Sequence, residues 1–304
     1  MFLYRNALTL LHRSILLLAL AAAAIPPALG ADDPRPYRVD SAGEGRSVWL
    51  VPGLASPGWV WDDLAGRLRA AGYRTHVLTL AGFAGEPPLE DDGPFLPRVR
   101  EALAADLAEA AGPKPVVIGH SLGGFPAFWL GATEAKHLAG IVAVDGVPFL
   151  SGLAGEEVTT ESQRQGAEQM AAFMASLTPE QFAQQNRMSL QVMITDPELR
   201  DRVADDSSRS DPATVGRAVG ELMTTDLRPM MSDVEVPALL VQAADSGANE
   251  VVRQAYAQQV ADIPDHRHVV ADKGRHFVQL DDPEFLAREV LEFLDEIEQD
   301  ASHE

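Results

Sequence analysis

The stretch that decides the fold runs from Lys114 to Gly124 and reads KPVVIGHSLGG. A short apolar, β-branched run is followed at once by the pattern Gly-x-Ser-x-Gly, and then by a segment rich in Ala, Phe and Leu. This order predicts a strand, a sharp turn that exposes the hydroxyl of Ser121, and a helix. Gly119 and Gly123 are needed because a Cβ at either place would strike the neighbouring strand or helix. Ser121 is therefore the candidate nucleophile.

The segments around this stretch alternate between strand patterns and helix patterns. Residues 59–71 and 96–111 repeat apolar side chains at helical spacing. The alternation with continuous apolar strands predicts an α/β fold, in which a mostly parallel sheet is flanked by helices on both faces. The further runs that are typical of strands are residues 36–40, 47–51, 74–80, 141–144, 237–241 and 266–271.

Residues 150–228 interrupt this alternation, because they contain helix-start signals and no convincing strand. We interpret this segment as a helical insertion between two parts of one core, residues 31–149 and 229–304. A capping residue followed by a proline in the first turn is typical of a helix start. This pair recurs at Thr178-Pro179, Asp196-Pro197 and Asp211-Pro212.

The first 30 residues are predicted to be an export signal and not part of the fold. Arg5 and Arg13 provide a basic start, residues 15–25 are apolar, and small residues precede a cleavage site before Ala31. The apolar run is short for a membrane span, although an uncleaved anchor is the alternative. We expect a bacterial protein that is periplasmic or secreted, without stable membrane insertion after the signal is removed.

Charge and cysteine content exclude several classes of partner and site. The formal net charge is −21 at pH 7, so the surface repels nucleic acid and anionic lipid, and we exclude both as partners. The chain contains no cysteine. Disulfide bonds, thiolate metal sites and a cysteine nucleophile are therefore excluded.

A serine nucleophile requires a base to accept its proton and an acid to orient that base. His276 follows the last predicted strand in a loop that contains glycine, and it is the candidate base. Asp245 follows the preceding strand closely and is the favoured acid, whereas Asp145, at the end of the strand after the nucleophile helix, is the alternative. His120 is adjacent to Ser121 and is interpreted as a packed group.

Acyl transfer also requires hydrogen-bond donors for the oxyanion that develops on the substrate. The backbone N–H of Leu122, directly after the nucleophile, is one candidate. The second is the backbone N–H of Leu54, in the loop after the strand that ends at Val51. Such a site needs no cofactor and no metal ion.

The motifs of this chain resemble those of the α/β-hydrolase superfamily over residues 36–298. Within it, the chain resembles the branch of lipases, esterases and lactonases. The resemblance implies an α/β-hydrolase fold and a helical cap, formed by residues 150–228, over Ser121. One departure is that many relatives have His-Gly where this chain has Pro52-Gly53. The residues that carry the resemblance are 51–54 with Trp59 and Trp61, 81–85, 119–124, 226–229, Asp245 and 274–277.

Three aromatic residues, Trp59, Trp61 and Phe83, lie in loops beside the expected oxyanion hole, and we predict that they line the substrate pocket. The cap also contains many flexible apolar side chains, which would suit a small apolar ester-like substrate. Most of them are interpreted as packing between cap and core. They are Met170, Phe173, Met174, Phe182, Met188, Leu190 and Met193.

The leading functional hypothesis is an exported serine hydrolase that cleaves carboxylic esters or lactones through an acyl-enzyme. One alternative is an aminopeptidase that acts on N-terminal proline, which would require an acidic residue in the cap to hold the free amine. Another is a ligand-binding homologue without turnover, because a fold does not guarantee an activity. Oligomeric state and the natural substrate do not follow from these patterns.

Overall fold

The computed structural model of the chain describes residues 35–244 and 250–301. The predicted export signal, residues 1–30, and the predicted acid, Asp245, lie outside these residues. Among the helices of the described residues, none combines the length and the apolarity that a membrane crossing requires.

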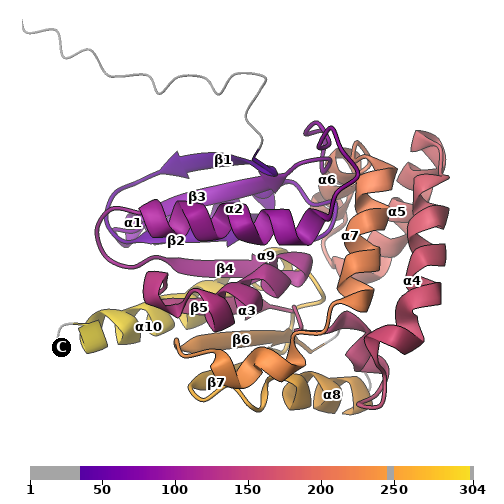
Figure 1. Ribbon diagram of the computed structural model, residues 1–304. Helices are drawn as coiled ribbons and strands as arrows, with labels where there is room; N and C mark the ends of the chain where they lie inside the picture. Colours follow the sequence, from indigo (N-terminus) through magenta and orange to yellow (C-terminus); the bar gives the residue numbers. More distant parts are fainter. Residues whose placement is uncertain (1–34, 245–249, 302–304) are drawn as a thin grey trace, which may run out of the picture. The chain divides into compact units, whose positions relative to one another are not determined.

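A seven-stranded sheet forms the centre of the described residues (Figure 1). The strands lie in the order β1-β3-β2-β4-β5-β6-β7, and neighbours are parallel except for β1, which runs antiparallel to β3. The chain reverses after β1 at Gly43 and Gly45, which both have positive φ. The predicted mostly parallel sheet is thus confirmed. The strands are β1 (Tyr37–Ala42), β2 (Ser47–Val51), β3 (Arg74–Leu80), β4 (Val116–His120), β5 (Gly140–Val144), β6 (Ala238–Ala243) and β7 (His266–Ala271).

Helices cover both faces of this sheet, because successive side chains of a strand point to opposite faces. In β2, Val48 and Leu50 pack with α1 and α10, whereas Trp49 and Val51 pack with α2 and α3. Both apolar layers are fully shielded from water, as the continuous apolar strands predict. The helices of the core are α1 (Asp62–Ala70), α2 (Phe95–Glu109), α3 (Gly124–Thr133), α8 (Glu250–Val260), α9 (Val278–Asp281) and α10 (Pro283–Ala301).

Four further helices lie between β5 and β6 and gather at one end of the sheet, on the right in Figure 1. They fall within the segment predicted as a cap. The side chains of Thr178, Asp196 and Asp211 accept backbone hydrogen bonds at three of the helix starts, as the cap-plus-proline pattern indicates. These helices are α4 (Thr160–Ala175), α5 (Pro179–Met193), α6 (Pro197–Ser207) and α7 (Pro212–Thr224).

The cap is attached to the core through Glu221 of α7. Its two carboxylate oxygens accept the backbone N–H groups of Phe95, at 2.8 Å, and Leu96, at 2.7 Å. Both N–H groups belong to the first turn of α2 and would otherwise lack a partner. Burial raises the pKa of Glu221, although these two donors act in the opposite direction. The side chain of Glu221 therefore provides acceptors for the N-terminal N–H groups of α2 and joins the cap to this core helix.

We expect replacement of Glu221 by alanine to lower the free energy of unfolding by about 1–3 kcal/mol, because two N–H groups lose their acceptor. Urea unfolding followed by circular dichroism measures the change. The control is Glu235→Ala, at an exposed position before β6, which should alter stability by less than about 0.5 kcal/mol. Equal effects of the two substitutions would contradict this role of Glu221.

Candidate active site

Ser121 lies at the bend between β4 and α3 and has a φ of +51°, a conformation that non-glycine residues rarely adopt. The bend is tight because backbone meets backbone there. A Cβ at Gly119 would overlap the carbonyl oxygen of Gly123, and a Cβ at Gly123 would overlap that of Val51. The glycine requirement inferred from the sequence therefore has a direct steric cause. The tight bend places Ser121 at the cavity described below.

His276 follows β7 and lies at the same end of the sheet. Its Nδ1 is 2.6 Å from Oδ2 of Asp145, which directly follows β5. The other carboxylate oxygen of Asp145 accepts the backbone N–H of Ala243 at 3.0 Å. Since a carboxylate oxygen accepts, Nδ1 of His276 donates, and in the neutral form of the ring Nε2 is then the nitrogen that can accept a proton.

Among the described residues, the acceptor at His276 is thus Asp145, the alternative to the acid that the sequence pattern favours. Asp245 lies outside the described residues. The two candidates follow adjacent parallel strands, β5 and β6, and a sheet brings the carboxyl ends of such strands to one edge. Order along the chain therefore could not decide between them.

His120 connects the bend at Ser121 to the loop that carries His276. Its ring is fully buried, and its Nε2 donates to the backbone carbonyl of His276 at 2.8 Å. The ring also lies 4.6 Å from that of Phe277 and makes an edge contact with Trp61. Burial lowers the pKa of His120 well below its ordinary value, and the proximity of His276 adds to this effect. A neutral His120 therefore positions the main chain of His276.

The two residues predicted to supply the oxyanion donors lie near Ser121. Leu54 lines the cavity, and Leu122 is buried directly after Ser121. Next to Leu54, Ala55 has a φ of +56°, and Asp145 has one of +47°. Of the four non-glycine residues with positive φ in the described chain, three therefore lie at this site. Strained backbone conformations of this kind concentrate at functional sites.

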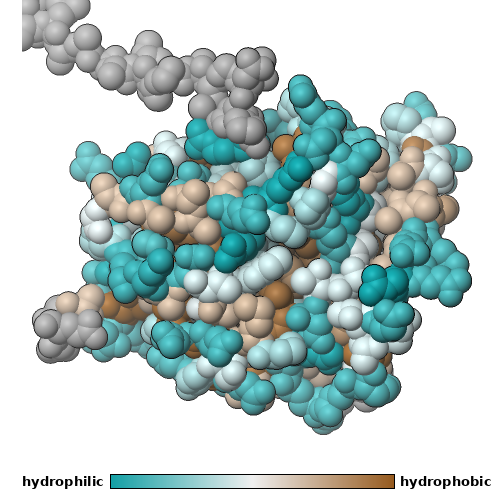
Figure 2. Space-filling view, viewed as in Figure 1, coloured by the Kyte–Doolittle hydropathy of each residue, from teal (hydrophilic) through white to brown (hydrophobic). Residues whose placement is uncertain are grey.

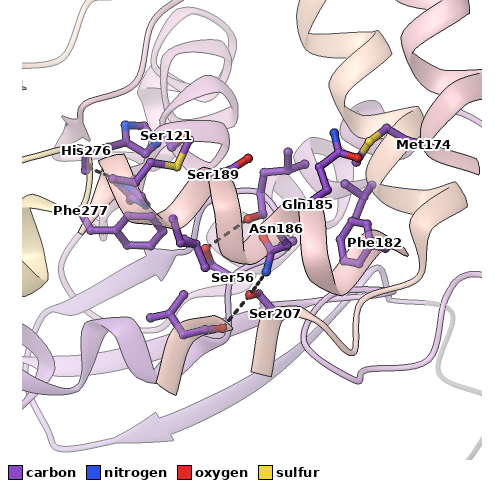
Figure 3. A pocket seen from close by; sticks show the side chains of 17 residues that line it. Ser56, Ser121, Met174, Phe182, Gln185, Asn186, Ser189, Ser207, His276 and Phe277 are labelled. Carbon is purple, nitrogen blue, oxygen red and sulfur yellow. Dashed lines mark hydrogen bonds between the residues drawn. The ribbon is translucent and has the colours of Figure 1, made fainter. Parts of the chain in front are cut away.

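A cavity of about 200 Å³ lies between this end of the sheet and the cap (Figure 3). Ser121 and His276 line it from the core. Helix α5 covers it with one face, on which residues 182, 185, 186, 189, 190 and 193 recur at helical spacing. Asp, Glu, Lys and Arg are absent from the lining, which consists of Leu54, Ala55, Ser56, His120, Ser121, Met174, Phe182, Gln185, Asn186, Ser189, Leu190, Met193, Val203, Ser207, Val215, His276 and Phe277.

The three aromatic residues predicted to line the pocket do not do so. Trp59 contacts α6 of the cap instead, where its Nε1 donates to Asp206 at 2.6 Å and the guanidinium of Arg202 lies over its ring. Trp61 is buried behind His120, and Phe83 packs against Phe95 in the core. The prediction was wrong because closeness to the site along the chain does not determine the direction of a side chain.

The aromatic and apolar lining comes from the cap instead, through Met174, Phe182, Leu190 and Met193. From the sequence, most of the apolar cap residues were predicted to pack between cap and core. The polar lining residues were not predicted; among them, Nδ2 of Asn186 donates to Oγ of Ser207 at 2.5 Å. The helical spacing of residues 182–193 could have indicated them, because it places polar and apolar residues on one face.

The described residues contain no group of three or more His, Asp or Glu side chains that could hold a metal ion. The cavity presents the hydroxyl of Ser121 and the imidazole of His276, which is paired with the carboxylate of Asp145. This set suits nucleophilic acyl transfer.

Comparisons with known proteins agree with this architecture. N-formylmaleamate deformylase of Pseudomonas putida is 28% identical over 276 residues, covering 86% of this chain and 93% of that protein. Pimeloyl-[acyl-carrier protein] methyl ester esterase of Aeromonas salmonicida is 34% identical over 110 residues, covering 36% of this chain and 41% of that protein. A solved thermophilic esterase of Thermogutta terrifontis has the same fold, with a TM-score of 0.71 at 18% identity, covering 86% of this chain and 93% of that one.

Relatives named as esterases and hydrolases support a hydrolase activity. The profile of the alpha/beta hydrolase family matches residues 50–289, most of the chain. The chain therefore belongs to the alpha/beta hydrolase family.

Proposed function

We propose that this protein is a serine hydrolase that cleaves carboxylic esters or lactones through an acyl-enzyme. The observation that carries the proposal is the pair of His276 and Asp145, joined at 2.6 Å, at a cavity that Ser121 also lines. An imidazole oriented by a carboxylate beside an exposed serine is the arrangement that activates a hydroxyl as a nucleophile. Relatives that are named as esterases add support.

In the proposed reaction, Ser121 Oγ attacks the substrate carbonyl while Nε2 of His276 accepts its proton. Asp145 stabilises the imidazolium that forms. The N–H groups of Leu122 and Leu54 stabilise the oxyanion. His276 then returns the proton to the departing alkoxide, and a water activated by the same ring hydrolyses the acyl-enzyme.

The described residues include no hydrogen bond between Ser121 and His276, so the proposed proton transfer requires the two side chains to come within hydrogen-bond distance when substrate binds. Catalytic hydrogen bonds are often long in the absence of substrate and shorten when it binds.

The lining of the cavity favours an ester over the free amine of a peptide. An aminopeptidase would need a carboxylate to hold the substrate ammonium, and neither Asp nor Glu lines the cavity. The strained backbone at Ser121 and the intact pair of His276 and Asp145 argue against a protein that only binds a ligand, because binding alone gives no reason to keep them.

We also propose that the protein is exported to the periplasm or secreted, on the basis of the signal pattern in residues 1–30. Expression in a bacterium followed by cell fractionation should recover the chain outside the cytoplasm. Its intact mass should correspond to a first residue of Ala31. Recovery of the full-length chain in the membrane fraction would favour the uncleaved anchor instead.

We expect Ser121→Ala to lower kcat/KM for nitrophenyl acetate by at least about 10³-fold, because the nucleophile is removed. A fluorophosphonate should label the wild-type chain at Ser121 alone, as shown by peptide mass spectrometry. Undiminished turnover by the variant would refute the proposed function.

We expect Asp145→Asn to lower kcat by about 10³- to 10⁴-fold, because asparagine cannot stabilise the imidazolium and favours the wrong tautomer of His276. The matched control is Asp245→Asn, which removes the acid favoured by sequence and should change kcat by less than threefold. Steady-state kinetics of the two variants separate the candidates. The reverse order of effects would assign the role to Asp245.

A further inference from the structure

A second hollow opens on the outer side of the cap, between α4 and α5. Its volume is about 550 Å³, and its apolar residues, Phe173, Leu177 and Met188, stand among uncharged polar ones. We call it the outer groove. Its complete lining is Phe173, Leu177, Gln181, Gln184, Gln185, Met188 and Ser189.

The outer groove adjoins the cavity at Ser121. Gln185 and Ser189 line both spaces, and they lie one turn apart on α5. On the opposite wall, α4 turns Met174 into the cavity and its neighbour Phe173 into the groove. A ligand that reaches from Ser121 into the groove would therefore pass beside Gln185 and Ser189.

The two walls belong to different helix pairs. Helix α4 packs closely on α7, where a Cβ at Gly216 would lie 2.6 Å from the carbonyl oxygen of Ala171. Helix α5 is joined to α6 through the hydrogen bond between Asn186 and Ser207. Each wall of the groove is therefore held by a helix on its other side.

The groove exposes large apolar side chains, which soluble proteins gather mainly at binding sites. Phe173 is 50% exposed and Met188 is 67% exposed. Figure 2 shows a mostly hydrophilic surface, with apolar side chains reaching it around α4 and α5. Asp, Glu, Lys and Arg are absent from the lining of groove and cavity, although such residues make up 23% of the chain. The whole path suits an uncharged, apolar ligand.

The cavity alone is small for a complete substrate. Its volume of about 200 Å³ lies below the roughly 300–1,000 Å³ of pockets that enclose a drug-sized ligand. It can hold the reacting ester group and a few atoms on either side. Any longer substituent must leave the cavity, and the groove adjoins the cavity at Gln185 and Ser189.

We propose that the outer groove binds the aliphatic chain of an uncharged ester whose carbonyl lies at Ser121. This inference rests on the proposed ester hydrolysis and adds its substrate class: medium- to long-chain esters without a carboxylate or phosphate. Chain atoms beyond the cavity pack on Phe173, Leu177 and Met188, and the glutamine side chains line the groove without introducing charge.

Two other occupants are less consistent with the structure. A second copy of the chain would bring together two molecules of net charge −21. A lipid surface that is anionic would be repelled by the same charge. Groove and cavity share the lining residues Gln185 and Ser189, and this adjacency to Ser121 favours the substrate itself.

The test measures kcat/KM for nitrophenyl esters from acetyl to decanoyl, and for alkyl acetates of matching length, below their critical micelle concentrations. The expected result is a rise of about two- to threefold per methylene in one of the two series, once the chain is longer than the cavity. The series that rises identifies whether the acyl or the alcohol side occupies the groove. A flat or falling dependence in both series would overturn the proposal.

Variants locate the effect. Phe173→Gln and Met188→Gln should each lower kcat/KM for the longest ester of the rising series by about fivefold or more and change that for the acetyl ester by less than twofold. The matched control is Val192→Gln, on the same helix, 70% exposed and part of neither lining. It should leave both values within twofold. An equal loss on short and long esters, or the same effect at Val192, would overturn the proposal.

A binding measurement keeps the groove separate from the proposed chemistry. In the Ser121→Ala variant, calorimetry with 1-octanol and 1-butanol should show tighter binding of octanol, by at least tenfold, and Phe173→Gln should remove this preference. Loss of the preference together with a dimer in sedimentation would assign the groove to a second copy. Octanol binding without any Ser121-dependent ester hydrolysis would refute the proposed function but support the groove.

Discussion

The structure depends on the close approach of main chains around Ser121. Glycines occupy two of these close contacts. A Cβ at Gly123 would overlap the backbone of β2, and a Cβ at Gly146 would lie 2.7 Å from the carbonyl oxygen of Ser121. The positive φ of Ser121 costs of order 1–3 kcal/mol, and it persists because the sheet and α3 leave the chain no alternative. The central strands β2, β4 and β5 therefore position the serine before any cap residue contributes.

The cap is also hydrogen-bonded to the loop that carries His276, the proposed base. Phe277 donates its N–H to the carbonyl of Met193, the last residue of α5. Asp281 accepts hydrogen bonds from both Thr195 and the N–H of Arg275. The loop of His276 thus binds the C-terminal end of α5, and the buried ring of His120 is hydrogen-bonded to the same loop. The face of α5 that lines the cavity therefore has a defined position relative to Ser121, which is a requirement for selecting among substrates.

Sequence patterns predicted those features that depend on neighbouring residues in the chain. They did not predict features that depend on the direction in which a side chain points in the folded protein. The strand, bend and helix around Ser121 lie within a dozen residues, so their order alone predicted the fold. The choice between Asp145 and Asp245 depended on which of two adjacent strand ends faces the imidazole, and spacing carries no such information. Trp59 was misplaced for the same reason, because its partner, Asp206, is distant in sequence. Polar lining residues such as Asn186 become visible only when the orientation of α5 is known.

The contrast between surface and site also follows from electrostatics. A protein of net charge −21 is kept in solution and apart from its copies by that charge, but the same field repels anionic ligands. A cavity lined by Lys or Arg could overcome this repulsion locally, and this cavity has neither. Its uncharged lining also costs less free energy to desolvate when an apolar group enters than a charged lining would. The negative surface and the uncharged lining of the cavity therefore both favour ligands without charge.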